Sequence, residues 1–374
     1  MCYQLKIPAR INLLGNPGDA NEGDFAVLGM AVDIYASATI AAADDICFEG
    51  YESGTTQTPF ATYRYPVSEI PLPYGGELDL IAGAINRLHS YSAEFREKIR
   101  QGGFNIAIRS DVPRQSGLGG SSLFIQLTLA GLRAFYQLNP LKHNDYILAE
   151  LTQQVESLEL GIACGFADRY LPVFGGIAYM DFRGKAFHHG LNNEPLATIE
   201  NLTPFVESIP LVAVSSGILH NSGSVHGVMR PKYLQEYNQW MQSGGEMPPM
   251  VRFMSAAWET AWKGKYALLQ DDLPTVGQQM VRNHQIVDEM MTYCGFSDGA
   301  GWANNLLIDT AMQSGALGAK LTGAGGGGSV FALTHPGEEE RVMDAWQNIA
   351  RIHDLTNATI YQPRVSSGLT VEQI

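Results

Sequence analysis

A glycine-rich stretch in the first half of the chain has the residue types of an anion site. Residues Pro113–Ser122 read PRQSGLGGSS and lie between an expected strand and an expected helix. Glycine lets the backbone approach phosphate oxygens closely, and the free N–H groups at the start of the next helix favour negative charge. Ser121 and Ser122 add hydroxyls, one of which can reach Mg²⁺. The pattern predicts a phosphate site, with a flexible turn and a serine N-cap as the alternative.

A second glycine cluster lies near the end of the chain. Residues Lys320–Ser329 read KLTGAGGGGS and stand between two expected strands. Consecutive glycines allow backbone dihedrals and close approaches that other residues do not. A hairpin tip without a ligand is the alternative. We expect a loop that contacts the phosphates or the base of a cleft.

A carboxylate stands beside a cation in a third stretch. Residues Glu159–Arg169 read ELGIACGFADR, so Asp168 emerges from a turn of small residues next to Arg169. An aspartate can accept the proton of a hydroxyl group. Arg169, and Arg10 if the fold brings it close, would keep Asp168 ionised and offset negative charge that develops during a transfer. Taken alone, an Asp-Arg pair is usually an ordinary salt bridge.

Composition narrows the classes of protein. A chain of 374 residues is long enough for two domains that share a cleft, where small ligands bind. A net charge of −14 argues against nucleic acid and anionic membranes as partners. Four scattered cysteines without metal spacing indicate reduced thiols. With no export signal expected at the N-terminus, we predict a cytoplasmic protein.

Hydrophobic periodicity predicts a mixture of strands and helices in both halves of the chain. A polar stretch around residues 190–201 is the expected boundary, which gives domains 1–200 and 201–374. Strands are expected over residues 5–14, 30–51 (a pair), 104–108, 176–182, 209–215 and 329–334, with short strands at residue 320 and near residue 359. Helices are expected at 77–89, 121–137, 144–158, 250–270, 273–293 and 338–353. The arrangement indicates the α+β class.

The three motifs, together with Pro8–Gly15 (PARINLLG), resemble the GHMP small-molecule kinase superfamily. That superfamily is named for galactokinase, homoserine kinase, mevalonate kinase and phosphomevalonate kinase. The motifs occur in family order and span nearly the whole chain. The resemblance implies an α+β, two-domain GHMP kinase fold, with an N-terminal ribosomal-protein-S5-like domain and a C-terminal ferredoxin-like domain. It also implies ATP as co-substrate and Mg²⁺ as cofactor.

The resemblance assigns roles to individual residues. Asp168 resembles the catalytic aspartate, and Arg10 resembles the basic residue beside it. Ser122, or the serine before it, resembles the serine that contacts Mg²⁺. Glu156 resembles the acidic metal ligand, with Glu159 as the second choice. The residues expected to bind ATP and its phosphates are Pro113, Gly117, Leu118, Gly119, Gly120, Ser121, Ser122, Gly323, Gly325 and Gly326.

Within the superfamily the sequence resembles glucuronokinase most. The stretches that carry this resemblance are Ala9–Asp19, Pro113–Ser122, Asp168–Phe182 and Ser222–Leu234. It implies ATP-dependent phosphorylation of the anomeric hydroxyl of glucuronate. The residues expected to bind the sugar are Asn16, Asp19, Arg169, Ser222, His226 and Arg230.

The sugar itself has alternatives. Ala167 replaces the glutamine that usually precedes the Asp-Arg pair in glucuronokinases, and Ser224 stands where a lysine is expected. Arg230 is the first choice to bind a uronate carboxylate, at a helix that we expect to begin at Pro231. The alternatives are a 1-kinase of a neutral sugar or heptose phosphate, and a non-catalytic ligand sensor with the same fold. The expected partners are a sugar and ATP, and the chain is expected to be a monomer or homodimer.

Overall fold

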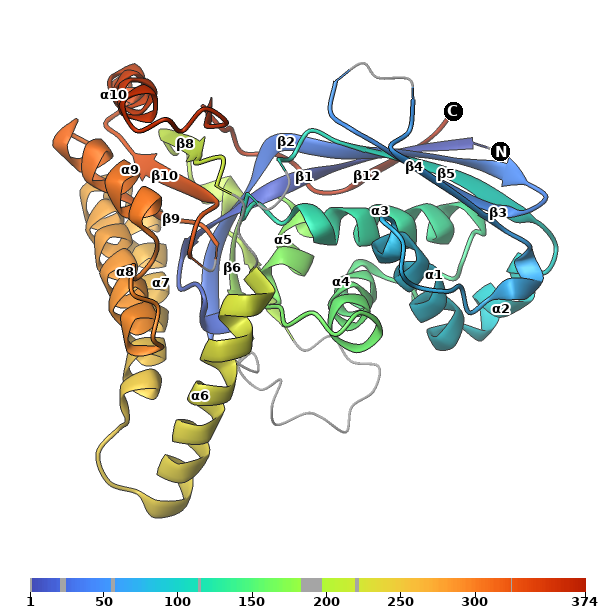
Figure 1. Ribbon diagram of the computed structural model, residues 1–374, viewed down its shortest axis with the longest axis horizontal. Coiled ribbons are helices and arrows are strands. Elements are labelled where there is room, and N and C mark those ends of the chain that lie inside the picture. Colours follow the sequence, from blue (N-terminus) through green and yellow to red (C-terminus); the bar gives the residue numbers. More distant parts are fainter. Residues whose placement is uncertain are drawn as a thin grey trace.

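Two β-sheets and their covering helices make up the computed structural model. It describes residues 2–20, 25–54, 58–113, 116–182, 197–218, 222–323 and 325–374. Figure 1 shows the larger sheet, with helices beneath it, beside a group of long helices and the smaller sheet. Strands and helices thus mix in both regions, and the predicted α+β class is confirmed.

The larger sheet has eight strands and is mostly antiparallel. Its order is β12-β1-β2-β5-β3-β4, while β6 pairs with β2 and β7 pairs with β6. Only β3 and β5 run parallel among the described pairs of this sheet. The strands are β1 (Cys2–Leu14), β2 (Ala26–Ala43), β3 (Ile46–Tyr51), β4 (Ala61–Tyr65), β5 (Gly103–Ser110), β6 (Ile177–Asp181), β7 (Thr198–Asn201) and β12 (Thr370–Gln373).

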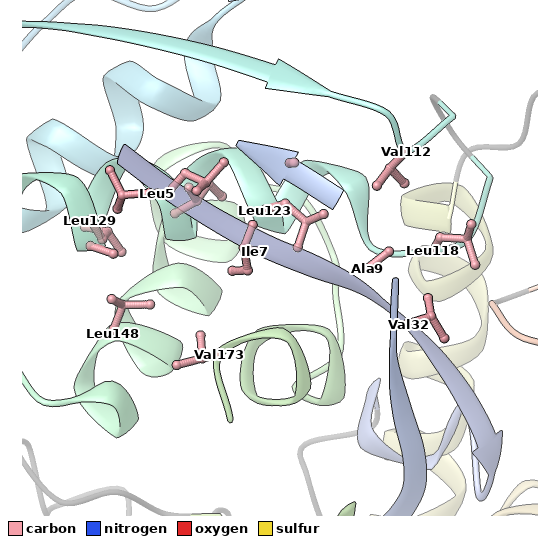
Figure 2. Close-up of a cluster of buried hydrophobic side chains, with 14 of the residues drawn as sticks. Leu5, Ile7, Ala9, Val32, Val112, Leu118, Leu123, Leu129, Leu148 and Val173 are labelled. Atoms are coloured by element: carbon pink, nitrogen blue, oxygen red, sulfur yellow. The ribbon is translucent and has the colours of Figure 1, made fainter. Parts of the chain in front are cut away.

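Helices pack on one face of this sheet (Figure 1). They are α1 (Asp79–Tyr91), α2 (Ala93–Ile99), α3 (Gly120–Phe135), α4 (Asp145–Gln154) and α5 (Ala167–Phe174). Figure 2 shows Leu5 and Ile7 of β1 beside Leu123 of α3, with Leu148 and Val173 from α4 and α5 nearby. Burying each such side chain contributes about 1.5–3 kcal/mol, so this core holds α3 and α5 firmly against β1.

The smaller sheet is antiparallel, in the order β11-β8-β10-β9. Its strands are β8 (Leu211–Ser215), β9 (Gly318–Leu321), β10 (Ser329–Leu333) and β11 (Thr359–Tyr361). Trp346 of α10 and Leu307 of α9 are buried in one cluster with Val212 and Val330 of this sheet. The helices of this region are α6 (Ser222–Ser243), α7 (Pro249–Leu269), α8 (Leu273–Tyr293), α9 (Trp302–Gln313) and α10 (Glu339–Ile352).

The C-terminal segment returns to the first sheet. Strand β12 pairs antiparallel with β1, with Lys6 opposite Thr370. Before it, the N–H of Leu369 donates to the carbonyl of Val173 in α5 at 3.1 Å. The division into domains 1–200 and 201–374 stays a prediction. No helix in the described part of the chain is long and apolar enough to cross a membrane.

Three sequence expectations about helices need correction. The helix expected to begin at Pro231 begins at Ser222, and Pro231 lies inside α6. The helix expected over residues 144–158 ends as an α-helix at Gln154, and a π-helical turn follows at Val155–Glu159. Asp168, expected in a turn, lies in the first turn of α5.

Candidate active site

A cavity of about 290 Å³ brings the three sequence motifs together. Its walls come from β1, the loop after it, the first glycine loop, the π-helical turn and residues 162–169. His226 of α6 and Gly323 of the second glycine loop complete the lining. Segments that are far apart in sequence therefore share one polar cavity of the size that small ligands occupy.

Asp168 and Arg10 meet at the centre of this cavity. The Nε of Arg10 donates to Oδ1 of Asp168 at 2.6 Å, and its Nη2 contacts Oδ2 of the same carboxylate. The Nη1 of Arg10 also donates to the carbonyl of Gly117. One guanidinium thus joins the first glycine loop to the carboxylate, as the sequence analysis required if the two were to act together.

Glu156 forms a second ion pair directly beside the first. Its Oε1 accepts a hydrogen bond from Ser121 Oγ at 2.8 Å, and its Oε2 contacts Nη2 of Arg169. The Nη1 of Arg169 lies 3.5 Å from Oδ2 of Asp168. Burial lowers the pKa of Arg169 to about 9, against an opposing effect of the Asp19 carboxylate, so it stays charged at neutral pH. The charges therefore alternate from Arg10 to Glu156.

The oxygens around Glu156 suit a hard cation. Ser121 lines the cavity, whereas Ser122 is 1% exposed and its Oγ lies 3.4 Å from Glu156 Oε1. A carboxylate and a hydroxyl are donors that Mg²⁺ accepts, with phosphate and water oxygens filling its other positions. Glu159 faces elsewhere, because Arg87 and Tyr74 bind its carboxylate. Among the described residues, no group of three or more acidic, histidine or cysteine side chains is arranged so that it could hold a metal ion by itself.

The loop after β1 bonds to two other segments of the site. Oδ2 of Asp19 accepts the N–H groups of Phe166 and Ala167 at 2.8 and 2.9 Å, which caps the start of α5. Burial and the neighbouring Asp168 carboxylate raise the pKa of Asp19. Asn16 donates to the carbonyl of Gly323 at 3.2 Å and so links this loop to the second glycine loop. The side chains of Asp19 and Asn16 thus bond to other segments of the protein, and both also line the cavity.

The two glycine loops lie against each other. A Cβ placed on Gly117 would lie 3.6 Å from Cα of Gly323, and one on Gly328 would lie 3.0 Å from the carbonyl oxygen of Ser116. Gly119 precedes α3 with φ 86°, a conformation that favours glycine. The expected phosphate residues that line the cavity are Gly117, Gly119, Gly120, Ser121 and Gly323; those that do not are Pro113, Leu118, Ser122, Gly325 and Gly326.

The expected sugar-binding residues are only partly gathered at the cavity. His226 lines it, whereas Arg230 lies one turn further along α6 and outside the lining. Burial and the Asp168 carboxylate raise the pKa of the Cys164 thiol, which lines the cavity, to about 12, while the charge of Arg230 opposes this rise. Ser222 begins α6, but its side chain lies outside the described residues, as do Arg114 and His220. Ala167 is buried in an apolar cluster rather than exposed to the cavity.

Family models match both halves of the molecule. The model described as GHMP kinases N terminal domain matches residues 79–176, and the model described as GHMP kinases C terminal matches residues 304–351. The chain belongs to the GHMP kinases. This GHMP kinase is therefore a phosphotransferase of a family that uses ATP.

Individual relatives of this GHMP kinase act on different sugars. It is 26% identical to Glucuronokinase 1 of Arabidopsis thaliana, over 88% of this chain and 85% of that protein. It is 25% identical to a galactokinase of Pyrococcus furiosus, over 91% of each. The crystal structure of Lactococcus lactis galactokinase with galactose has a TM-score of 0.75 at 18% identity, covering 99% of this chain and 95% of that one. The predicted two-domain GHMP kinase fold is confirmed.

Three buried polar residues of this GHMP kinase were missed by sequence reasoning. Nζ of Lys320 donates to Asn16 Oδ1 at 2.6 Å and to two backbone carbonyls, and burial lowers its pKa well below the ordinary value. Asn283 of α8 donates to the carbonyl of Asn16 at 3.1 Å. Gln126 of α3 donates to the carbonyl of Arg169 at 2.6 Å. Polar residues inside apolar helices and strands were the only available signal.

Proposed function

We propose that the protein is an ATP-dependent sugar kinase that phosphorylates the anomeric hydroxyl of glucuronate. One observation carries the proposal: Asp168 opens onto the cavity while Arg10 joins it to the glycine loop before α3. A phosphate held by that loop would lie beside a carboxylate that can receive the acceptor hydroxyl. This is the arrangement that phosphoryl transfer requires.

The nucleotide side of the site is built from backbone amides. The triphosphate would lie along Gly117–Ser121, at the N-terminus of α3, where N–H groups and the helix dipole favour negative charge. Ser121 and Glu156 would hold Mg²⁺, which neutralises charge on the phosphates. Arg169 neutralises the second oxygen of Glu156, so that the carboxylate stays in place without a metal.

The acceptor side depends on Asp168. Its carboxylate would orient the sugar hydroxyl and accept its proton as the phosphoryl group is transferred. Arg10 would hold that carboxylate in place through its hydrogen bonds and stabilise the charge that accumulates between the two reactants. The alternation of Arg10, Asp168, Arg169 and Glu156 places a guanidinium group beside each of two carboxylates in a small volume.

A uronate is supported by relatives and by charge. The alignment with Glucuronokinase 1 covers 88% of this chain, and α6 places His226 at the cavity with Arg230 one turn away. A cation near the acceptor would attract the sugar carboxylate. A neutral sugar is the second candidate, because the Pyrococcus furiosus galactokinase is similar at nearly the same identity. A non-catalytic sensor fits less well, because Arg10, Asp168, Arg169 and Glu156 are arranged as a transfer reaction needs.

A sugar panel tests the substrate. Glucuronate, galacturonate, galactose, glucose and heptose phosphates are compared with Mg·ATP, and the phosphorylated product is identified by mass spectrometry and NMR. We expect the 1-phosphate of glucuronate as the main product. Turnover of neutral sugars alone would show that the substrate is a neutral sugar, the second candidate, and not glucuronate. Nucleotide binding without any phosphorylated product would support the non-catalytic sensor.

The Asp168→Asn variant tests the chemistry. The amide keeps the size of the side chain but cannot accept the hydroxyl proton, so we expect transfer to fall on the order of 100-fold or more while nucleotide affinity is retained. Asp145→Asn is the control, because Asp145 pairs with Arg133 away from the cavity and should leave the rate unchanged. Near-normal transfer by Asp168→Asn would refute the assignment of the base.

A further inference from the structure

Helix α5, which carries Asp168, contains a proline in its interior. Pro172 lies four residues after Asp168, within a helix that runs from Ala167 to Phe174. In an α-helix the carbonyl of residue 168 would accept from the N–H of residue 172. Proline has no N–H, and its ring crowds the carbonyl four residues earlier. The backbone carbonyl of Asp168 therefore lacks its usual helical donor, and a buried carbonyl is normally paired.

A glutamine from the phosphate-binding helix stands where that donor is needed. Nε2 of Gln126 donates to the carbonyl of Arg169 at 2.6 Å and lies 3.4 Å from the carbonyl of Asp168. Gln126 is 0% exposed and does not line the cavity. Because both neighbouring groups are acceptors, the nitrogen of the amide must face them.

These contacts close a ring between two helices. At one end of the ring, Ser121 and Ser122 of α3 donate to Glu156, which pairs with the guanidinium of Arg169. One turn further along α3, Gln126 binds the backbone of Arg169 and its neighbour. The first turn of α5 is thereby held to α3 through a side chain and through its own carbonyls.

We propose that Gln126 is a positioning residue that fixes Asp168 relative to the phosphate-binding end of α3, in compensation for the donor that Pro172 lacks. This proposal rests on the proposed role of Asp168 as the base. Gln126 touches neither reactant and acts through the backbone of α5. Without its amide, the first turn of α5 keeps the Arg169–Glu156 contact but loses its backbone tie to α3. A shift of about 1 Å in a reacting group can cost on the order of 100-fold in rate.

The Gln126→Met variant removes the donor at nearly constant volume. With Mg·ATP and glucuronate, or the best acceptor of the sugar panel, we expect kcat to fall on the order of 10- to 100-fold. The dissociation constant of the nucleotide should stay within about twofold, because the glycine loop is untouched. Thr128→Val is the matched control: Thr128 is 0% exposed on the same helix, and its hydroxyl donates to the carbonyl of Phe124, within α3, at 2.8 Å. It should keep the wild-type kcat.

Restoring the missing donor should rescue the variant. In Gln126→Met/Pro172→Ala, the new N–H of residue 172 can bond the carbonyl of Asp168, and we expect at least a several-fold recovery of kcat over Gln126→Met. Pro172→Ala alone should remain near the wild-type rate. Thermal unfolding of every variant is measured so that kcat refers to folded protein, and a structural role alone would move the unfolding temperature without this pattern of rescue.

The outcomes separate the two proposals. A wild-type kcat in Gln126→Met, or a loss that Pro172→Ala fails to reverse, overturns the positioning role. If Asp168→Asn is inactive in the same assays, the proposed role of Asp168 as the base still holds even when the role of Gln126 is overturned. If Asp168→Asn keeps normal transfer, the proposed base falls, whatever Gln126 does.

Discussion

Two serines stand at the start of α3, but only Ser121 faces the cavity. Its hydroxyl donates to Glu156 at 2.8 Å, whereas Ser122 is buried beneath it. We predict that Ser121→Ala raises the Mg²⁺ concentration needed for half-maximal transfer on the order of tenfold, because a metal ligand is lost. The measurement is the initial rate against free Mg²⁺ at constant ATP.

Ser122→Ala is the matched control for that prediction. It removes an equivalent hydroxyl from the adjacent position, and its cost should appear mainly in the unfolding temperature. If Ser122→Ala changes the Mg²⁺ dependence and Ser121→Ala does not, the metal ligand is the buried serine that the family resemblance first suggested.

Residue types and their order were sufficient to choose residues that share one cavity, while their catalytic roles stay predictions. The glycine loop, Asp168 and Arg10 were all chosen from sequence, and the structure places them around one cavity. Gln126 was not found, because a glutamine in a helix has no local pattern that marks it. Its importance comes from the packing of α3 against α5, which joins residues more than 40 positions apart.

At the scale of elements, α5 depends on a cap from another segment. Asp19 accepts the first N–H groups of the helix, and a Cβ on Gly165 would lie 2.3 Å from its Oδ2. We predict that Gly165→Ala displaces this cap, with a loss of about 1–3 kcal/mol in the free energy of unfolding and a lower kcat. Denaturant unfolding and steady-state kinetics measure the two effects.

Gly102→Ala provides the comparison for that variant. A Cβ on Gly102 has no heavy atom within 4 Å, and its φ lies outside the left-handed region. It should leave both the stability and the rate close to wild type. An equal loss in both variants would show that Asp19 does not act as a specific cap.

The elements that the sequence misplaced share a physical cause. Pro231 was taken as a helix start because proline favours the first turn, but α6 accommodates it in its interior. The choice between Glu156 and Glu159 could not be made from a 3.6-residue period, because a π-helical turn changes which side chains face the same way. Both features depend on contacts with other parts of the molecule.

At the scale of the whole molecule, the C-terminal segment joins the two sheets. Strand β12 pairs with β1, and the preceding residues bond to Ala31 and to Val173 of α5. We predict that deletion of residues 370–374 lowers the free energy of unfolding by about 1–3 kcal/mol, through lost ladder hydrogen bonds, and leaves kcat unchanged. Deletion of residues 363–374 should lower kcat as well, because α5 loses its support. The measurements are the thermal unfolding and the steady-state kinetics of both truncated proteins. Equal kcat values for the two truncations would contradict a role for this segment in supporting α5.

The contacts of Arg10 have a consequence for the spacing of the two reactants. Its guanidinium bonds both the carbonyl of Gly117 and the carboxylate of Asp168. A planar group of fixed size therefore separates the first glycine loop from Asp168. A lysine there would keep the positive charge but has no such planar group. In the proposed reaction, the gap that a phosphoryl group crosses is therefore set by a side chain of β1, a strand that also contributes to the larger core.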